Sequence, residues 1–441
     1  MNYFVKLKTV FSSTSERNIE RLKHFYSDNN FLLSVIHELM APHLPDETIK
    51  NKRVFLKPNW VLHNRKETDE ICMRTDDKFL LAALEIILQK NPSRILIGDA
   101  PIQGCDWDKT VREPLKVAIS ALSQKYQVPI TIKDFRRVTF NPSSNNLVKE
   151  RNPLSDYVIF DLGNESYLEP ISHDGRNLFR VVDYDPDRLA ESHRSGVHKY
   201  CITKELFEND IVISLPKVKT HQKTGITNAL KILVGVNGDK DYLPHHRRGG
   251  TGSGGDCYPG NNILRKWSEI LIDQANRNRG KSQYKFWTNL SSKLWRLSFP
   301  AEEYSLDAAW YGNDTTWRMV LDLNKIAEYG KADGTISNTV QREIYSLSDG
   351  IIGGQGNGPL RPEPLSLGVV CFSNHSGMTD NVMGTLMGFD INKIPLLKFA
   401  SEQSNDKKID IFLNDKKIGL EEIKKYSIKT NPPPGWVNYL S

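Results

Sequence analysis

The chain of 441 residues contains few cysteines and no cysteine-rich motif. No CxxC is present, so the sequence gives no sign of a zinc ribbon, and we expect no iron–sulfur cluster. The cysteines are odd in number and widely spaced, which fits a reducing compartment and predicts a cytoplasmic protein. The five are Cys72, Cys105, Cys201, Cys257 and Cys371.

Long apolar runs are also missing. Residues 1–18 lack the apolar core of a signal peptide, and the run 79–88 is interrupted by Glu85 and too short to span a membrane. The net charge of +6 comes from 59 basic and 53 acidic side chains. This excess is too small for the length of the chain to indicate nucleic-acid binding, but it is compatible with an anionic ligand.

Several catalytic and nucleotide-binding signatures are absent. The sequence has no GxSxG and no cysteine in a catalytic context, so serine or cysteine nucleophiles are unsupported. The stretch 349–359 contains five glycines, but Pro359 and Pro362 oppose a following helix. We therefore reject a Rossmann or P-loop interpretation and expect a flexible loop that closes over a ligand.

Short β-branched runs alternate with helical patterns along the chain. This alternation predicts an α/β fold with a largely parallel sheet flanked by helices. The predicted strands are 53–56, 94–97, 129–132, 157–160, 210–214, 343–347 and 365–371. The predicted helices are 77–90, 108–125, 225–233, 263–276, 315–328, 377–387 and 394–400.

We divide the chain into four segments. Residues 1–50 are expected to form an N-terminal helical extension, and 51–275 the core α/β domain, including a long glycine-rich loop at 237–262. Residues 276–310 are a basic aromatic insert, and 311–441 complete the core. Lysines and aromatic residues interleave over 281–297, which fits either a helix that contacts a membrane surface or a partner, or a helix packed on the core.

Polar residues follow four of the predicted strands. Lys57 and Asn59 follow the first, Asp99 the second, the run 217–221 a third and Asp349 a fourth. Because the carboxyl ends of parallel strands meet at one edge of a sheet, we expect a ligand site there.

The run 217–231 is rich in lysine and precedes a predicted helix that begins near Thr224 or Gly225. Free amides at a helix N-terminus attract anions, although a solvated basic turn would show the same pattern. A desolvated Lys217 or Lys219 could instead act as a base. We assign substrate binding to Lys57, Asn59, Lys217, Thr220, Thr224, Gly225, Lys231 and Asp349.

Three histidines lie in or near this run. His245 and His246 are adjacent, and adjacent side chains on an extended backbone point to opposite sides, so only one of them should face a given site. Together with His221 and Asp99 they suit acid–base chemistry or a divalent metal. The catalytic candidates are Asp99, Lys219, His221, His245 and His246, and the candidate metal ligands are Asp99, His221 and His245.

Five motifs, in this order, resemble the DUF362 family of uncharacterised prokaryotic proteins. They are KPN at 57–59, GDAPIQGCDW at 98–107, the long motif at 215–249, DGIIGGQGNGP at 349–359 and the stretch 379–400. The resemblance implies no settled reaction. Some members carry a ferredoxin-type segment and are suspected of redox work, but this chain has no such cysteine cluster.

Converging lysine, histidine and aspartate side chains favour an enzyme that acts on an anionic or sugar-derived small molecule. A non-catalytic ligand-binding protein and an oxidoreductase with an external redox partner are the alternatives. We expect no nucleic-acid partner.

Overall fold

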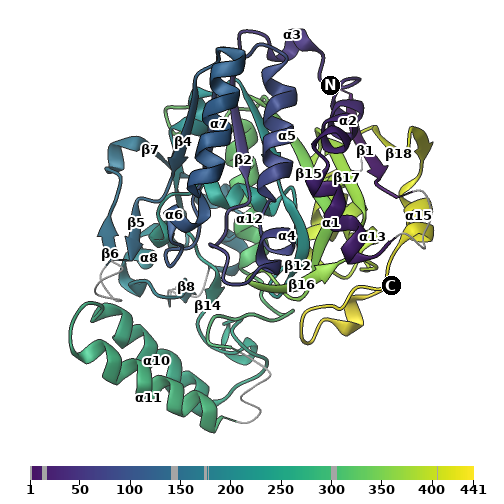
Figure 1. Cartoon of the computed structure of the whole chain (residues 1–441). Helices are drawn as coiled ribbons and strands as arrows, with labels where there is room; N and C mark the ends of the chain where they lie inside the picture. The colour runs from purple at the N-terminus through teal and green to yellow at the C-terminus, as the bar shows by residue number, and fades with distance from the viewer. Residues whose placement is uncertain are drawn as a thin grey trace.

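The computed structural model describes residues 2–11, 17–140, 148–172, 176, 178–298, 305–404 and 406–441. A 12-stranded sheet lies at the centre, with helices packed against it (Figure 1). Most of its strands run parallel, which confirms the predicted α/β class.

One half of the sheet is parallel. Its strands lie in the order β15-β11-β2-β3-β4, and their bounds are β15 (Glu343–Asn357), β11 (Ile211–Leu215), β2 (Arg53–Pro58), β3 (Arg94–Asp99) and β4 (Ile130–Asp134). The central strands are almost continuously apolar because both faces are covered. Helices α5 (Asp77–Leu88) and α7 (Glu113–Tyr126) connect strands of this half.

The other half contains the start and the end of the chain. Strand β17 (Val369–Ser373) runs antiparallel to both β15 and β1 (Tyr3–Thr9). Beyond β1 lie β18 (Ile409–Leu413) and β19 (Lys416–Ile418). The first fifty residues therefore contribute a strand inside the sheet before helices α1 (Ile19–Ser27), α2 (Asn29–Met40) and α3 (Asp46–Ile49).

The predicted helix 225–233 is wrong. Strand β12 (Lys217–His221) and strand β13 (Gly225–Thr227) pair antiparallel instead, and a 3₁₀ helix, η5 (Lys231–Val236), follows. Gly225 has φ of +78°, which a helical residue cannot adopt and which makes the tight turn between the two strands. The expected anion site at a helix N-terminus therefore has no helix to form it.

The expected flexible loop at 349–359 is also wrong. Strand β15 continues to Asn357 and pairs with β12 and with β16 (Arg361–Leu365). Its glycines permit close packing: a Cβ on Gly354 would lie 2.6 Å from the carbonyl oxygen of Cys72.

The remaining elements surround this sheet. Strand β7 (Tyr157–Asp161) belongs to a separate antiparallel sheet with β10 (Val197–Thr203) and β9 (His193–Arg194). Short strands are β5 (Val138–Phe140), β6 (Val148–Glu150), β8 (Phe179–Arg180) and β14 (His246–Arg247). Further helices are α4 (Thr68–Cys72), α6 (Trp107–Thr110), α8 (Pro186–Ser192), α9 (Glu205–Glu208), α12 (Thr316–Tyr329), α13 (Ser376–Leu386), α14 (Pro395–Glu402) and α15 (Leu420–Ile423).

A helical hairpin projects from this body (Figure 1). It consists of α10 (Ile263–Arg277) and α11 (Gln283–Leu297), which pack on each other. Among the described residues, none of the helices is both long and apolar enough to cross a membrane.

Candidate functional site

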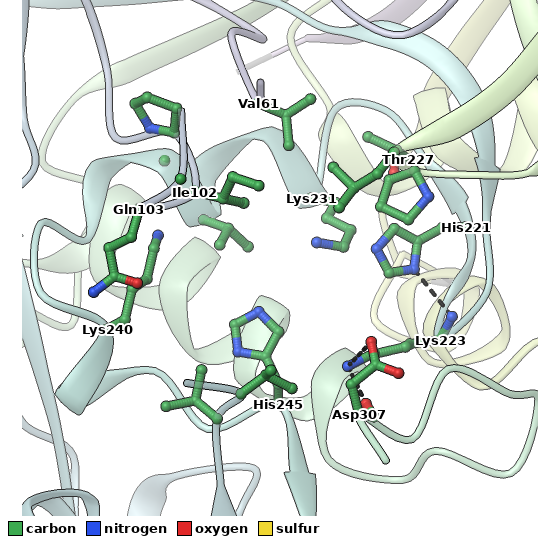
Figure 2. Close-up of a pocket in the computed structure, with 18 of the residues that line it drawn as sticks. Val61, Ile102, Gln103, His221, Lys223, Thr227, Lys231, Lys240, His245 and Asp307 are labelled. Atoms are coloured by element: carbon green, nitrogen blue, oxygen red, sulfur yellow. Dashed lines mark hydrogen bonds and ion pairs between the residues drawn. The ribbon is translucent and has the colours of Figure 1, made fainter. Parts of the chain in front are cut away.

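A cavity of about 780 Å³ opens at the carboxyl ends of β2 and β3, beside β12. Here β2 has β3 on one side and β11 on the other, an arrangement in which α/β sheets commonly bind ligands. Figure 2 shows basic side chains around an open centre, with Lys240 on one side and Lys231 and His221 on the other. The basic lining residues are Lys57, Lys219, His221, Lys223, Lys231, Lys240, His245 and Arg361.

Lys57 and Asp99 form one wall of the cavity. They end neighbouring parallel strands, and the Lys57 Nζ atom lies 2.7 Å from Asp99 Oδ1. Asp99 also accepts hydrogen bonds from the backbone N–H groups of Trp60 and Ala100, at 2.7 and 2.9 Å. Burial lowers the pKa of Lys57, and the negative charge of Asp99 opposes that shift. Asp99 therefore accepts hydrogen bonds from three donors, and its ion pair holds Lys57 in place at the cavity wall.

Three further lysines have depressed pKa values. Burial, with a contribution from Lys231, lowers the pKa of Lys219 to about 7. Burial also lowers the pKa of Lys231 to about 7, assisted by the charges of Lys223 and Lys240. The pKa of Lys240 falls to about 8, again mainly through burial. All three pKa values therefore lie close to pH 7, so each amino group can take up and release a proton at neutral pH.

Two of these amino groups lack a protein partner. Among the residues that the structure describes, the Nζ atoms of Lys231 and Lys240 form no hydrogen bond or ion pair. Lys219, in contrast, donates to the carbonyl oxygen of Met73. The side-chain Nε2 of Gln103, which also lines the cavity, is buried and unpaired within the described chain. Donors of this kind are open to an anionic ligand.

The two histidines of the cavity have opposite tautomers. His221 Nδ1 accepts a hydrogen bond from the backbone N–H of Lys223 at 3.1 Å, so its proton is on Nε2. His245 Nδ1 lies 2.8 Å from the carbonyl oxygen of Leu243 and must donate to it, which leaves Nε2 as an acceptor. Burial and nearby lysines hold the pKa of each ring well below its usual range, so both are neutral.

Lys223 is held by a residue from beyond the hairpin. Its Nζ atom donates to the backbone carbonyl oxygen of Asp307 and lies 3.5 Å from Asp307 Oδ2. Figure 2 shows this pair at the edge of the cavity, with His245 nearby at its lower rim. Segments on both sides of the hairpin therefore line the same cavity.

The structure brings together about half of the predicted site residues. Those that line the cavity are Lys57, Asn59, Asp99, Lys219, His221, Lys231 and His245. Those outside it are Lys217, Thr220, Thr224, Gly225, His246 and Asp349. The two threonines outside the cavity bond to backbone carbonyl oxygens of Gly356 and Ile226. Only one of the adjacent histidines, His245, faces the cavity, which is the alternation that an extended backbone requires.

Sequence reasoning missed several lining residues. Lys223 and Lys240 lie inside the long motif at 215–249, and their position in that motif is the feature of the sequence that could have identified them as site residues. Gln103 lies within GDAPIQGCDW. Asp307 follows the hairpin and had no signal, because a single acidic residue in an irregular segment has no pattern.

The candidate metal ligands do not form a metal site. No group of three or more His, Cys, Asp or Glu side chains in the described part of the chain is placed to hold a metal ion. Asp99, His221 and His245 all line the cavity without forming such a group.

The fold and cavity define an α/β protein with a basic, ligand-sized site at the edge of its sheet. The family model described as "Domain of unknown function (DUF362)" matches residues 167–384, which include the motifs at 215–249 and 349–359. This match over residues 167–384 confirms the predicted resemblance to the family.

The other comparisons add little. No curated protein matches the chain. A solved structure of a protein from Thermotoga maritima shares 8% identity, covers 86% of this chain, and has a TM-score of 0.29. The chain spans 59% of the length of that protein. A likeness this weak supports no conclusion about function.

Proposed function

We propose that the protein is an enzyme that binds an anionic small molecule in the lysine-rich cavity and catalyses proton transfer on it. One observation carries the proposal. Unpartnered amino groups of Lys231 and Lys240 and the free Nε2 atoms of His221 and His245 line a single cavity of the described chain.

The charge of the cavity favours an anion. Crowded, buried ammonium groups repel one another, which adds to the effect of burial in depressing the pKa values of Lys231 and Lys240. A bound carboxylate or phosphate would offset this repulsion and occupy the donors of Lys240 and Gln103. Val61 and Ile102 form an apolar part of the wall between the charged groups, suited to the carbon skeleton of the ligand (Figure 2).

The protonation states favour proton transfer. With a pKa of about 7, Lys231 is partly neutral at neutral pH, so its amine can accept a proton from a carbon next to a carbonyl group. The neutral His221 ring carries its proton on Nε2 and can donate a hydrogen bond to the carbonyl oxygen as negative charge develops there. The proton moves to Lys231, and the electron pair of the broken C–H bond moves onto that oxygen.

Deuterium exchange tests this assignment. The protein is incubated in D₂O with a panel of phosphorylated and carboxylated ketones, and incorporation of deuterium at carbon is followed by NMR. We expect exchange with wild type and a loss of at least about 100-fold in Lys231→Met, because general-base catalysis typically contributes this much. Lys331→Met, on an exposed lysine outside the cavity, is the matched control.

The same experiment separates an enzyme from a binding protein. Binding of each compound is measured in parallel by thermal shift and calorimetry. Compounds that bind to the wild type and lose affinity in Lys240→Met, without any exchange, would identify a non-catalytic binding protein. If no member of the panel binds, the anion site itself is rejected.

A further inference from the structure

Helix α10 of the helical hairpin α10–α11 contacts the body through polar side chains. Asp273 of α10 forms ion pairs with Arg180 and Arg248 of the body, at 2.9 and 2.7 Å. Glu269, one turn earlier, accepts a hydrogen bond from the backbone N–H of Gly249 at 2.8 Å and another from Tyr258. Both carboxylates are buried. An ordinary surface helix buries its apolar side instead.

The apolar side of α10 consequently faces away from the body. Ile263 and Trp267 are 65% and 53% exposed and are four residues apart, on a different side of the helix from Glu269 and Asp273. Ile270 continues this row and is half-buried. Isolated exposed apolar residues are common, but a row on one helix face is not.

Helix α11 extends the same apolar surface. Ser268 and Ser291 meet at the seam between the helices, with their Oγ atoms 2.9 Å apart. With the seam fixed there, the antiparallel arrangement places Phe286 and Leu297 on the same outer side as Trp267. Phe286 is 60% and Leu297 62% exposed. Four of the ten large apolar side chains exposed in the described chain thus lie on this hairpin.

The charges of the hairpin are almost all positive. Residues 263–298 contain eight basic side chains and two acidic ones, and both acidic ones are buried against the body. The exposed basic residues without an ion pair in the described chain are Lys266, Lys281, Lys285, Lys293 and Arg296. The outer surface of the hairpin therefore combines apolar and aromatic side chains with uncompensated positive charge.

We propose that this surface docks the protein onto an anionic lipid bilayer. Aromatic and aliphatic side chains of an interfacial helix insert at the headgroup level, while neighbouring lysines attract anionic headgroups. The helices lie in the plane of the membrane surface, since none of the described helices can span it. Charge complementarity selects an anionic surface over a neutral one.

Vesicle flotation with the full chain tests the docking. We expect binding to phosphatidylcholine vesicles that contain a third of phosphatidylglycerol, little binding to pure phosphatidylcholine, and weaker binding at high salt. Trp267→Asp and Phe286→Asp should each weaken binding by about tenfold or more, because each removes one large apolar anchor. Val117→Asp, at a 59% exposed position on α7, is the matched control and should bind like wild type.

Folding and self-association are checked on the same samples. The substituted side chains face away from the body, so thermal unfolding should be unchanged. Absence of vesicle binding by wild type would overturn the proposal. A dimer seen by light scattering that dissociates in Trp267→Asp, with no lipid binding, would instead assign the surface to a second copy of the chain and equally overturn it.

Discussion

Lys217 Nζ lies 2.5 Å from Asp349 Oδ2, and both side chains are completely buried. Tyr26 donates its hydroxyl proton to the other oxygen of the same carboxylate, at 2.5 Å. The pair connects β12 to β15, two neighbouring strands of the sheet. Because β12 also carries Lys219 and His221, this interaction positions the cavity residues without contributing to the lining itself.

Removal of one member of this pair should be strongly destabilising. Lys217→Met leaves the buried Asp349 carboxylate without its cation, and we expect the free energy of unfolding to fall by about 3–5 kcal/mol. Urea denaturation followed by circular dichroism measures the change. The double variant Lys217→Met, Asp349→Leu replaces both charges by apolar groups and should recover much of this loss. Equal losses of stability in the single and double variants would show that the unpaired carboxylate of Asp349 is not the cause of the destabilisation.

Gly235 is needed for the contact between Lys57 and Asp99. A Cβ at this position would lie 1.9 Å from Asp99 Oδ1 and 2.5 Å from Lys57 Nζ. Gly235→Ala should therefore separate the pair, lower the free energy of unfolding by about 3 kcal/mol and weaken binding of sulfate to the cavity. Both quantities are accessible by urea denaturation and calorimetry.

Gly104 provides the matched control, since it lines the same cavity and a Cβ added there would have no atom within 4 Å. Gly104→Ala should change the free energy of unfolding by less than about 0.5 kcal/mol. A similar loss in both variants would mean that the cavity tolerates no added methyl group anywhere.

Strands β2, β3 and β11 could be predicted because their apolar runs are short, β-branched and bounded by polar residues. Their parallel pairing follows from the helices between them, and it brings Lys57 and Asp99 together at one edge. This part of the site is therefore encoded locally.

The part of the site on β12 and in the segments after it is not encoded locally. Strand β12 has the sequence KVKTH, and nothing local shows that its two lysines are buried in a sheet, because burial of charge depends on partners from distant segments. The glycines of 349–359 conceal a strand for a similar reason: Gly354, for example, serves close packing against Cys72 and Lys219 rather than a turn. Lys240 begins a 3₁₀ helix of only three residues and Asp307 lies in an irregular segment, so neither belongs to a periodic pattern.

Lys231 should destabilise the ligand-free protein at neutral pH. Its pKa of about 7 in the folded state lies below the value of about 10.4 in the unfolded state, so unfolding takes up a proton at any pH between these two values. Proton uptake on unfolding favours the unfolded state, and Lys231→Met removes this destabilising effect. We expect the variant to be more stable than wild type by on the order of 2–4 kcal/mol at pH 7.

The gain should shrink as the pH rises toward 10, because the unfolded lysine then also loses its proton. Denaturation curves of both proteins between pH 7 and 10 measure the difference. A gain that is constant with pH would show that Lys231 is not the source of the linkage, and would point to better packing by methionine.

Anion binding should couple to proton uptake by Lys240. Its pKa of about 8 means that the side chain is partly neutral at pH 8–9, and a bound anion favours the charged form. Sulfate is a suitable probe because its charge is constant over this range. We expect the dissociation constant of sulfate to rise as the pH increases from 7 to 9, approaching tenfold per pH unit above the pKa for each lysine that must take up a proton.

Calorimetry in buffers of different ionisation enthalpy measures the number of protons taken up. Lys240→Met should bind sulfate more weakly and with a smaller proton uptake. Affinity that does not depend on pH would contradict a role for these lysines in binding, since neutral amines lack the charge that the anion requires.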